Sequence, residues 1–251
     1  IDKIICSKLE NCHKKLSKFN LIILTHVIEH IYNPVKVLKL LKSKLYEDGI
    51  ILIEVPYLSN IEYLPNGYLT FEHLNYFDRK SILNTVRKAG FNLIGKIDVD
   101  LKHDVYPIQR LLIKKNKNIQ NFNFKSKKNF KRNKIIMNKY QIKDDNIFKK
   151  MIKKIINKTN NKNFIVWGAG IHSSLLFTNQ KKIRSKISFY VDSDKKKWGK
   201  YLYGKKVFSP KFFFKNFKKN SLVTSTISEN QINTVLKKKF FKNKIINLYG
   251  K

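Results

Sequence analysis

The chain has no apolar run close to the roughly 20 residues that a helix needs to cross a bilayer. Its most apolar stretches are FNLIILTHVI at 19–28 and GIILIEV at 49–55, which have the length of buried strands. No basic segment followed by an apolar segment opens the chain, and this argues against a secretory signal peptide. We therefore expect a cytoplasmic protein without a membrane partner.

Cysteine is scarce, with Cys6 and Cys12 close together and no others. A structural zinc site usually takes four ligands, and the neighbouring His13 adds only a third. Two reduced thiols are the simpler interpretation for an intracellular protein. The sequence therefore predicts no metal site.

Acidic residues are also few: 17 Asp and Glu stand against 53 Lys and Arg, a formal net charge of +36. Such an excess can indicate nucleic-acid binding. The chain is also rich in Asn, Ile, Phe and Tyr, which points to an A/T-rich genome, and its lysines do not form one stripe. We expect weak, salt-sensitive binding to nucleic acid and no specific nucleic-acid partner.

The remaining composition, 42% hydrophobic and 13% aromatic, is that of a folded protein. Its first part alternates strand-like and helix-like patterns. We expect a strand at 19–24, a helix from Pro34, a turn at 47–49, a strand at 50–55 stopped by Pro56, a loop at 57–72, a helix at 79–89 between the N-cap Asp78 and Gly90, and an antiparallel pair at 91–101 and 106–115.

The second part begins with a Lys/Asn-rich segment at 116–161, expected to be disordered at 116–135 and then helical. From Asn163 the α/β alternation restarts, with four strands and three helices expected in about 90 residues. The pattern of these residues favours a small Rossmann-like domain.

Two segments carry a family resemblance. FNLIILTHVIEHIYNPVKVLKLLKSKLYEDGIILIEVP (19–56) resembles the fourth-to-fifth-strand region of class I S-adenosylmethionine (SAM) methyltransferases, and FEHLNYFDRKSILNTVRKAGF (71–91) resembles the loop and helix that follow. The resemblance implies SAM as cofactor, with Thr25 and His26 beside its methionine end. His26 and His30 could also serve packing and capping, and Glu29 is expected to cap the turn or pair with a lysine.

The chain departs from this family in two ways. No glycine precedes Gly49, so the family's SAM-binding glycine loop is missing, and Asn20 stands where the family usually has Asp. The chain also begins with Ile1 instead of Met, so we expect a fragment of a longer protein. The expected fold is α/β: a partial class I methyltransferase Rossmann-like sheet over 1–115, a linker and connecting helix over 116–161, and a second small Rossmann-like α/β domain over 162–251.

A narrower resemblance is to sugar-nucleotide C-methyltransferases, whose acceptor loop carries Tyr-x-Glu-His followed by an aromatic residue. Glu72, His73 and Tyr76 match this motif, while Thr70 replaces its tyrosine. The resemblance implies that His73 removes a proton beside a sugar keto group, with Glu72 and His30 in support. The same loop occurs in O-methylating relatives. An O- or N-methyltransferase of another small acceptor, or a non-catalytic nucleotide-sugar-binding fragment, therefore stays open.

The segment VWGAG (166–170) lies between an expected strand and helix. Gly168 and Gly170 allow a tight turn, and Asp192 ends the next strand, where an acid can reach ribose hydroxyls. On its own this Gly-x-Gly pattern is a weak signal. Together with residues 192–210 it resembles the C-terminal domain of the sugar C-methyltransferases, which implies a nucleotide-sugar ligand bound at these three residues.

Overall fold

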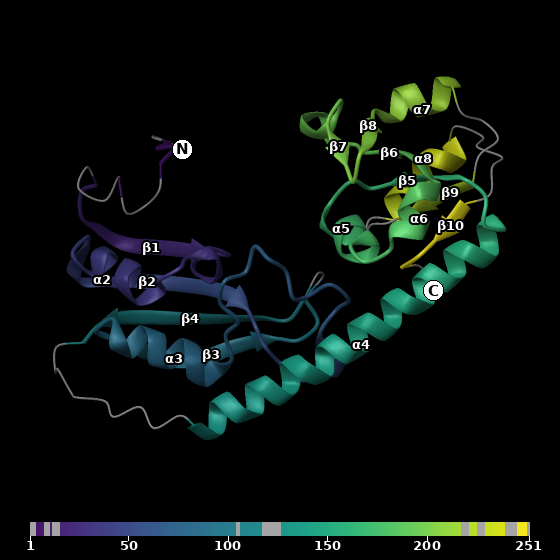
Figure 1. The fold of residues 1–251 in the computed structure, drawn as a ribbon. Coiled ribbons are helices and arrows are strands. Elements are labelled where there is room, and N and C mark those ends of the chain that lie inside the picture. Colours follow the sequence, from purple (N-terminus) through teal and green to yellow (C-terminus); the bar gives the residue numbers. More distant parts are fainter. Residues whose placement is uncertain are drawn as a thin grey trace. The chain divides into compact units, whose positions relative to one another are not determined.

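The computed structural model describes residues 4–7, 11, 16–103, 106–116, 127–216, 221–224, 229–238 and 245–249. The chain forms two compact units, residues 1–141 and residues 142–251 (Figure 1). Cys6 is an exposed free thiol, whereas Cys12 lies outside the described residues. Among the described helices, none is both long enough and apolar enough to span a membrane.

The first unit contains a four-stranded sheet with the order β1-β2-β4-β3. Strands β1 and β2 are parallel, and the other two pairings are antiparallel. The strands are β1 (Phe19–Thr25), β2 (Leu45–Pro56), β3 (Phe91–Asp100) and β4 (Ile108–Lys115). The predicted strands at 19–24 and 50–55 and the antiparallel pair that follows are confirmed.

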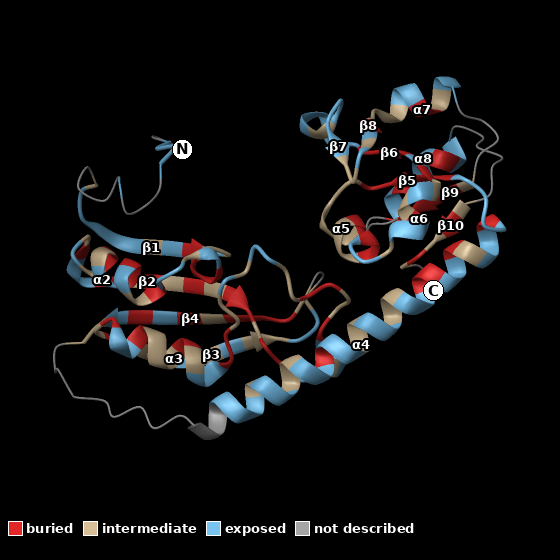
Figure 2. Ribbon diagram, viewed as in Figure 1, coloured by how far each residue is buried: buried red, intermediate tan, exposed pale blue. Residues whose placement is uncertain are grey.

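One face of this sheet forms the core with α2 (Pro34–Lys42) and α3 (Arg79–Lys88) (Figure 2). The predicted N-cap Asp78 is confirmed and forms a capping box with Ser81, whereas the cap of α2, Asn33, was not predicted. Side chains of β2 that point to the helices, including Ile51 and Ile53, are fully buried.

The opposite face of the sheet carries an apolar row with much less cover. Ile23 pairs with Leu52, Leu52 with Leu112, and Leu112 with Ile94, so all four share one row across the strands. Ile23 is 57% exposed and Leu112 is 38% exposed. The unit therefore has one packed face and one largely open apolar face.

The predicted turn at 47–49 is wrong, because these residues lie inside β2. The register shifts there: Phe19 pairs with Leu45 but Leu21 with Ile50, so extra residues of β2 form a bulge. A Cβ at Gly49 would lie 2.9 Å from the carbonyl oxygen of Phe19. Glycine at this position thus allows the bulged backbone to approach β1.

The expected disorder at 116–135 also needs correction. Helix α4 spans Lys127–Thr159, so it begins well inside that segment, while residues 117–126 lie outside the described part of the chain. Tyr140 anchors this helix in the first unit. Its hydroxyl donates to the carbonyl of Pro65 at 2.7 Å and accepts from the amide of Tyr68 at 2.8 Å.

The second unit contains a six-stranded sheet with the order β10-β9-β5-β6-β8-β7, which is parallel except for β7. Two buried clusters hold it together. Its elements are β5 (Phe164–Trp167), α5 (Ile171–Phe177), α6 (Lys181–Lys186), β6 (Ile187–Val191), β7 (Tyr201–Leu202), β8 (Lys205–Phe208), α7 (Pro210–Asn216), β9 (Ser221–Thr224), α8 (Glu229–Lys238) and β10 (Ile245–Asn247).

Helix α6 and strands β7 and β8 were not predicted. Strands β7 and β8 form a short hairpin around Tyr203 and Gly204, both at positive φ (50° and 74°). Strand β8 then pairs with β6 in parallel. These strands have only two and four residues, and β8 begins with two lysines, so their local pattern is weak and their pairing is decided by the rest of the sheet.

Candidate functional site

His26 lies at the carboxyl end of β1, where an open α/β sheet usually binds its ligand. Its backbone has φ +52°, and its amide donates to the carbonyl of Glu54 at 3.0 Å. Its ring lies between two carboxylates: Nδ1 is 3.2 Å from Oε1 of Glu29 and Nε2 is 3.4 Å from Oε1 of Glu54. Thr25, the last residue of β1, is exposed beside it. His26 is therefore held in one orientation by acids on two elements.

Glu29 and His30 belong to the short 3-10 helix Ile28–His30. The side chain of Glu29 is 1% exposed, and its Oε1 lies 3.9 Å from Nε2 of His30. Oε2 of Glu29 is buried and has no hydrogen-bond partner. The expectation that Glu29 caps the turn or pairs with a lysine is wrong: its carboxylate faces histidines.

The loop that contains His73 is fastened onto this 3-10 helix by backbone groups. The amides of Leu74 and Asn75 donate to the carbonyl of Glu29 at 2.9 and 3.0 Å, and Nδ2 of Asn75 donates to the carbonyl of Ile31 at 2.7 Å. These bonds place the ring of His73 with its centroid 4.8 Å from that of His30. Two histidines 43 positions apart thus become neighbours.

Glu72 contacts the two histidines' site through its backbone carbonyl. Nδ1 of His30 lies 2.8 Å from the carbonyl oxygen of Glu72 and donates to it. Among the described residues, the exposed carboxylate of Glu72 makes no hydrogen bond or ion pair. The structure therefore brings His30, Glu72 and His73 together, with the carbonyl of Glu72 orienting His30.

His73 has the properties of a neutral imidazole at pH 7. Burial lowers the pKa of His73, and positive charge on His30 lowers it further, while Glu72 acts in the opposite direction. Its Nδ1 is buried without a hydrogen-bond partner. A neutral ring with an unsatisfied nitrogen can accept a proton or bind a cation.

Three tyrosines border the same place: Tyr76 of the motif, and Tyr68 and Tyr106, which the sequence analysis did not single out. The rings of Tyr68 and Tyr106 are 6.2 Å apart, and the ring of Tyr106 lies 5.7 Å from His26 and 6.4 Å from His73. The Tyr68 hydroxyl is buried without a partner, and burial raises the pKa of Tyr68. Tyr76 lies 5.9 Å from His73.

Thr70, which replaces the motif's tyrosine, is bound through its backbone to Tyr76. The Tyr76 hydroxyl accepts from the amide of Thr70 at 2.7 Å and donates to its carbonyl at 2.9 Å. Oγ1 of Thr70 is buried without a partner. The site therefore has several unsatisfied polar atoms, on Glu29, Tyr68, Thr70 and His73.

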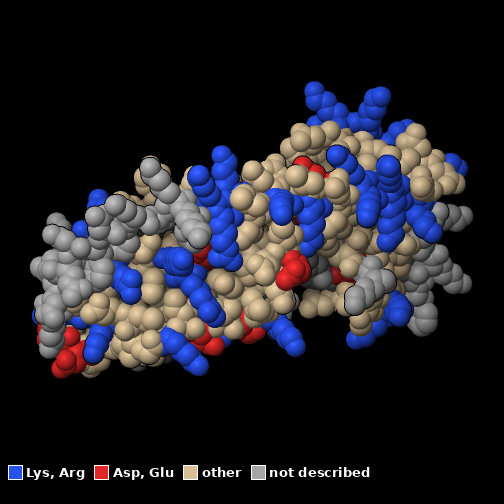
Figure 3. All heavy atoms as spheres, turned by 90° about the horizontal axis from the view of Figure 1, so that it is seen from below, with Lys and Arg blue, Asp and Glu red and all other residues tan. Residues whose placement is uncertain are grey.

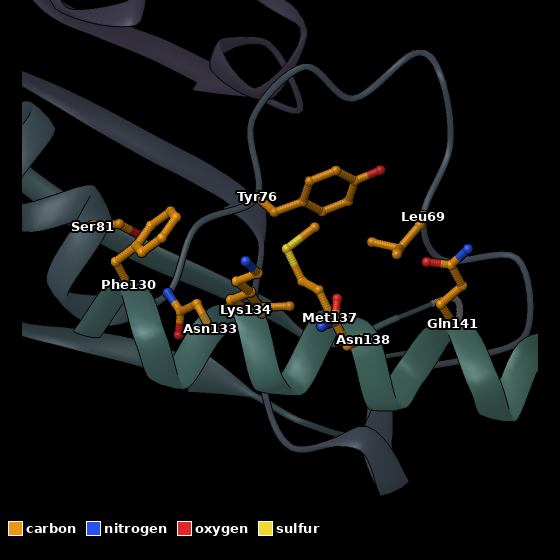
Figure 4. Close-up of a pocket in the computed structure, with 10 residues that line it drawn as sticks. Leu69, Tyr76, Ser81, Phe130, Asn133, Lys134, Met137, Asn138 and Gln141 are labelled. Carbon is orange, nitrogen blue, oxygen red and sulfur yellow. The ribbon is translucent and has the colours of Figure 1, made fainter. Parts of the chain in front are cut away.

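A cavity of about 560 Å³ opens beside Tyr76, between the 57–78 loop and the first part of α4 (Figure 4). Leu58, Leu69, Tyr76 and Met137 form much of its apolar wall. Most of the polar groups come from α4 (Asn133, Lys134, Asn138 and Gln141), and Ser81 of α3 adds a hydroxyl. Such a space suits a small organic ligand with a polar edge.

In the second unit, Gly168 follows β5 at φ +114°, and Gly170 precedes α5. Oδ2 of Asp192 accepts from the amide of Ala169 at 2.8 Å and from Nζ of Lys197 at 3.0 Å. Oδ1 accepts from the amide of Asp194 at 2.9 Å. Asp192 thus ties the glycine turn to the loop after β6, and its carboxylate is engaged by the protein itself.

Lysine and arginine side chains are scattered over the face shown in Figure 3, interspersed with other residues. No single stripe of positive charge stands out in that view.

Solved structures similar to this chain are methyltransferases of low identity. A SAM-dependent methyltransferase from Archaeoglobus fulgidus is 15% identical, with a TM-score of 0.36, over 44% of this chain and 66% of that one. The 1,6-didemethyltoxoflavin-N1-methyltransferase of Burkholderia thailandensis is 14% identical, with a TM-score of 0.33, over 40% of this chain and 45% of that one. Mitomycin 7-O-methyltransferase is 10% identical, with a TM-score of 0.33, and the match covers 41% of this chain and 32% of that one.

The chain thus spans between 32% and 66% of the length of these three proteins. None of the curated proteins matches it. The family model described as a methyltransferase domain matches residues 5–96, which include β1, the histidines of the site and the loop between them. Residues 5–96 are therefore similar to the methyltransferase domain family, and this match implies SAM as the cofactor.

Proposed function

We propose that this chain is part of an enzyme that methylates a nucleotide-linked sugar at a carbon beside a keto group, with His73 as the base. The observation that carries the proposal is the unpartnered Nδ1 of His73 in a cluster of buried polar atoms that lack partners. A base must be neutral and have a free lone pair before it takes a proton. Burial lowers the pKa of His73, which favours the neutral ring, and its Nδ1 has no hydrogen-bond partner that would compete for a proton.

His30 and Glu72 would act as positioning residues. The carbonyl of Glu72 orients the ring of His30, and this ring packs against His73. Abstraction of the proton breaks a C–H bond and leaves an enolate, and positive charge then develops on His73. The nearby carboxylate of Glu72 would stabilise that charge, since it raises the pKa of His73.

SAM would supply the methyl group as a sulfonium. Thr25, exposed at the end of β1, and His26 fit one edge of its site. His26 is oriented by Glu29 and Glu54, which would fix that edge. The sequence has no glycine before Gly49, so these residues do not make up a complete SAM site.

The acceptor would reach the site from the cavity beside Tyr76, whose ring also contacts His73. In the second unit, Gly168, Gly170 and Asp192 would bind the nucleotide of a nucleotide-sugar. Strand β5 lies between β6 and β9, the place in a doubly wound sheet where ligands usually bind. Because Asp192 already accepts from Ala169 and Lys197, Lys197 would have to move for a ribose to reach the carboxylate.

Proton abstraction can be measured without a methyl donor. The chain is incubated in D₂O with dTDP-, UDP- or GDP-linked 4-keto sugars, and deuterium at the carbon beside the ketone is followed by NMR. We expect enzyme-dependent exchange that falls about 10²- to 10⁴-fold in His73→Asn. His172→Asn, a histidine of the second unit, is the matched control and should exchange at the unchanged rate.

Calorimetric titrations of the same chain with nucleotide-sugars and S-adenosylhomocysteine separate the alternatives. Binding without exchange, followed by methylation of oxygen or nitrogen once the donor is bound, would replace C-methylation by O- or N-methylation. Binding of a nucleotide-sugar with neither reaction would favour a binding fragment. No binding of any nucleotide-sugar contradicts the proposed substrate class.

A further inference from the structure

We propose that Glu29, His30 and His73 form a binding site for a divalent first-row transition-metal ion. Each of the three offers one ligand atom, and these atoms all lie within 4.8 Å of one another. The group combines a carboxylate with two imidazoles, contributed by a 3-10 helix and by the loop that is docked on it.

A second observation comes from the buried atoms of these side chains. Oε2 of Glu29 has no hydrogen-bond partner although that side chain is only 1% exposed. Nδ1 of His73 is buried and unpartnered as well. A buried acceptor without a partner is unfavourable, and more so when it is charged, so a cation at this point would remove that penalty.

The outer hydrogen bonds are those that a metal centre uses. A metal-bound histidine usually donates its other ring nitrogen to a carbonyl or carboxylate, which sets its tautomer. Nδ1 of His30 donates to the carbonyl of Glu72 at 2.8 Å, so Nε2 carries the free lone pair. His26 supports Glu29 in the same way, with Nδ1 3.2 Å from Oε1. Two of the three ligands, His30 and Glu29, are therefore already held in place by hydrogen-bond partners.

The donor set identifies the class of ion. Imidazole suits Zn²⁺, Fe²⁺ and Co²⁺, whereas Mg²⁺ and Ca²⁺ prefer ligand sets made of oxygen. Two histidines and one carboxylate leave positions for water or a ligand. With metal–ligand bonds of about 2.1 Å, neighbouring ligand atoms lie about 3.3 Å apart, so the side chains would move together by at most about 1.5 Å. Changes of side-chain torsion are sufficient for such a movement.

Metal binding at this place has a consequence that rests on the proposed function. A His73 that holds a cation through Nδ1 cannot accept a proton on that atom. If His73 is the base, the cation and the proton exclude one another, and the loaded chain should not catalyse deuterium exchange.

The site is tested by titrating the metal-free full chain with Co²⁺ and following the visible absorption of the bound ion. The affinity tag is removed, and Cys6→Ser and Cys12→Ser form the background, so that neither a tag nor a thiol binds the ion. We expect one ion per chain. Glu29→Gln, His30→Asn and His73→Asn should each weaken binding at least tenfold.

Two variants serve as controls: His172→Asn removes a histidine from the second unit, and Glu62→Gln removes an exposed carboxylate of the first unit that is not a ligand. Both should keep the affinity within about twofold. Circular dichroism checks folding. If the buried Glu29→Gln unfolds, His30→Asn decides the matter, because the His30 side chain is 40% exposed. Unchanged affinity in folded His30→Asn, or no saturable binding below millimolar Co²⁺, would overturn the site. Neither acceptor nor methyl donor is present, so the result is independent of the exchange assay.

Discussion

Nδ1 of His26 lies 3.2 Å from Oε1 of Glu29, and this contact joins the end of β1 to the most buried carboxylate of the site. His26 also has a left-handed backbone, with φ +52°, which is uncommon for a non-glycine residue. Its ring is kept in place by both Glu29 and Glu54. The strained backbone and the two carboxylates together mark His26 as a residue that the surrounding structure holds firmly.

Replacing His26 by Ala should lower the free energy of unfolding of the first unit by about 1–3 kcal/mol, because a buried carboxylate loses its partner. His26→Gly loses the same partner but relieves the positive φ, so it should be more stable than His26→Ala by about 1 kcal/mol. Urea unfolding followed by circular dichroism gives these values. Both tryptophans, Trp167 and Trp198, belong to the second unit, so their fluorescence is an internal control. Wild-type stability in His26→Ala would mean that this contact contributes nothing.

The two faces of the first sheet can be compared with two identical substitutions. Ile53 is fully buried under the helices, whereas Ile23 is 57% exposed on the open face. Ile53→Ala should cost about 2–5 kcal/mol through lost burial and a cavity, and Ile23→Ala less than about 1 kcal/mol. Hydrogen exchange of peptides from the first unit measures both. Equal costs would show that something covers the open face in solution.

The second unit should lose stability when the pH falls below 6.5. Burial lowers the pKa of His172, whose Nδ1 lies 3.1 Å from the Tyr249 hydroxyl. The unfolded chain then binds a proton at higher pH than the folded chain does. The contribution of neutral His172 to the stability of the second unit is therefore fully present above pH 6.5, the ordinary pKa of histidine. It declines as the pH falls from 6.5 toward the lower pKa of His172 in the folded chain.

Tryptophan fluorescence during urea unfolding at pH 7.5 and pH 5.5 measures this effect. His172 is the only histidine in residues 142–251, so His172→Gln should make the two midpoints nearly equal. If His172→Gln keeps the full difference between the two pH values, another group is responsible for it.

Asp192 is expected to stabilise the second unit whether or not a nucleotide binds. Its Oδ2 accepts from Ala169 and Lys197, so Asp192→Ala should cost about 1.5–3 kcal/mol. Asp194 is an exposed acid two positions later whose side chain accepts from Lys196, and Asp194→Ala should cost less than about 1 kcal/mol. Trp198 fluorescence should shift in Asp192→Ala, because Nε1 of Trp198 donates to the Asp192 carbonyl. Equal costs for the two acids would contradict a special role of Asp192.

Local sequence patterns were sufficient to predict the two helices that cover the first sheet. The helix Pro34–Lys42 and the helix Arg79–Lys88 were predicted with their caps, Asn33 excepted, because a cap and an apolar stripe act within a few residues. Local patterns failed at the bulge before Gly49, where β1 determines the conformation. They also failed for β7 and β8, whose pairing depends on β6.

Prediction of the site was less complete. His30 and His73 were found through a family motif, which names residues but not their contacts. Glu29, Glu54 and Tyr68 were not chosen, because their roles arise from burial and from neighbours distant in sequence. Adjacent Glu29 and His30 alone are a weak sequence signal for a binding site. The signal becomes informative only when the structure places a second histidine, His73, beside them.

The amino-acid sequence by itself determined the alternation of strands and helices, the caps of α3, the excess of positive charge and the methyltransferase character of residues 5–96, since all of these are local or additive properties. Only the tertiary structure decided which face of the sheet is buried and which side chains meet. Backbone hydrogen bonds from Leu74 and Asn75 to Glu29 bring His73 to His30, and no pattern in the chain encodes a contact between groups 43 residues apart.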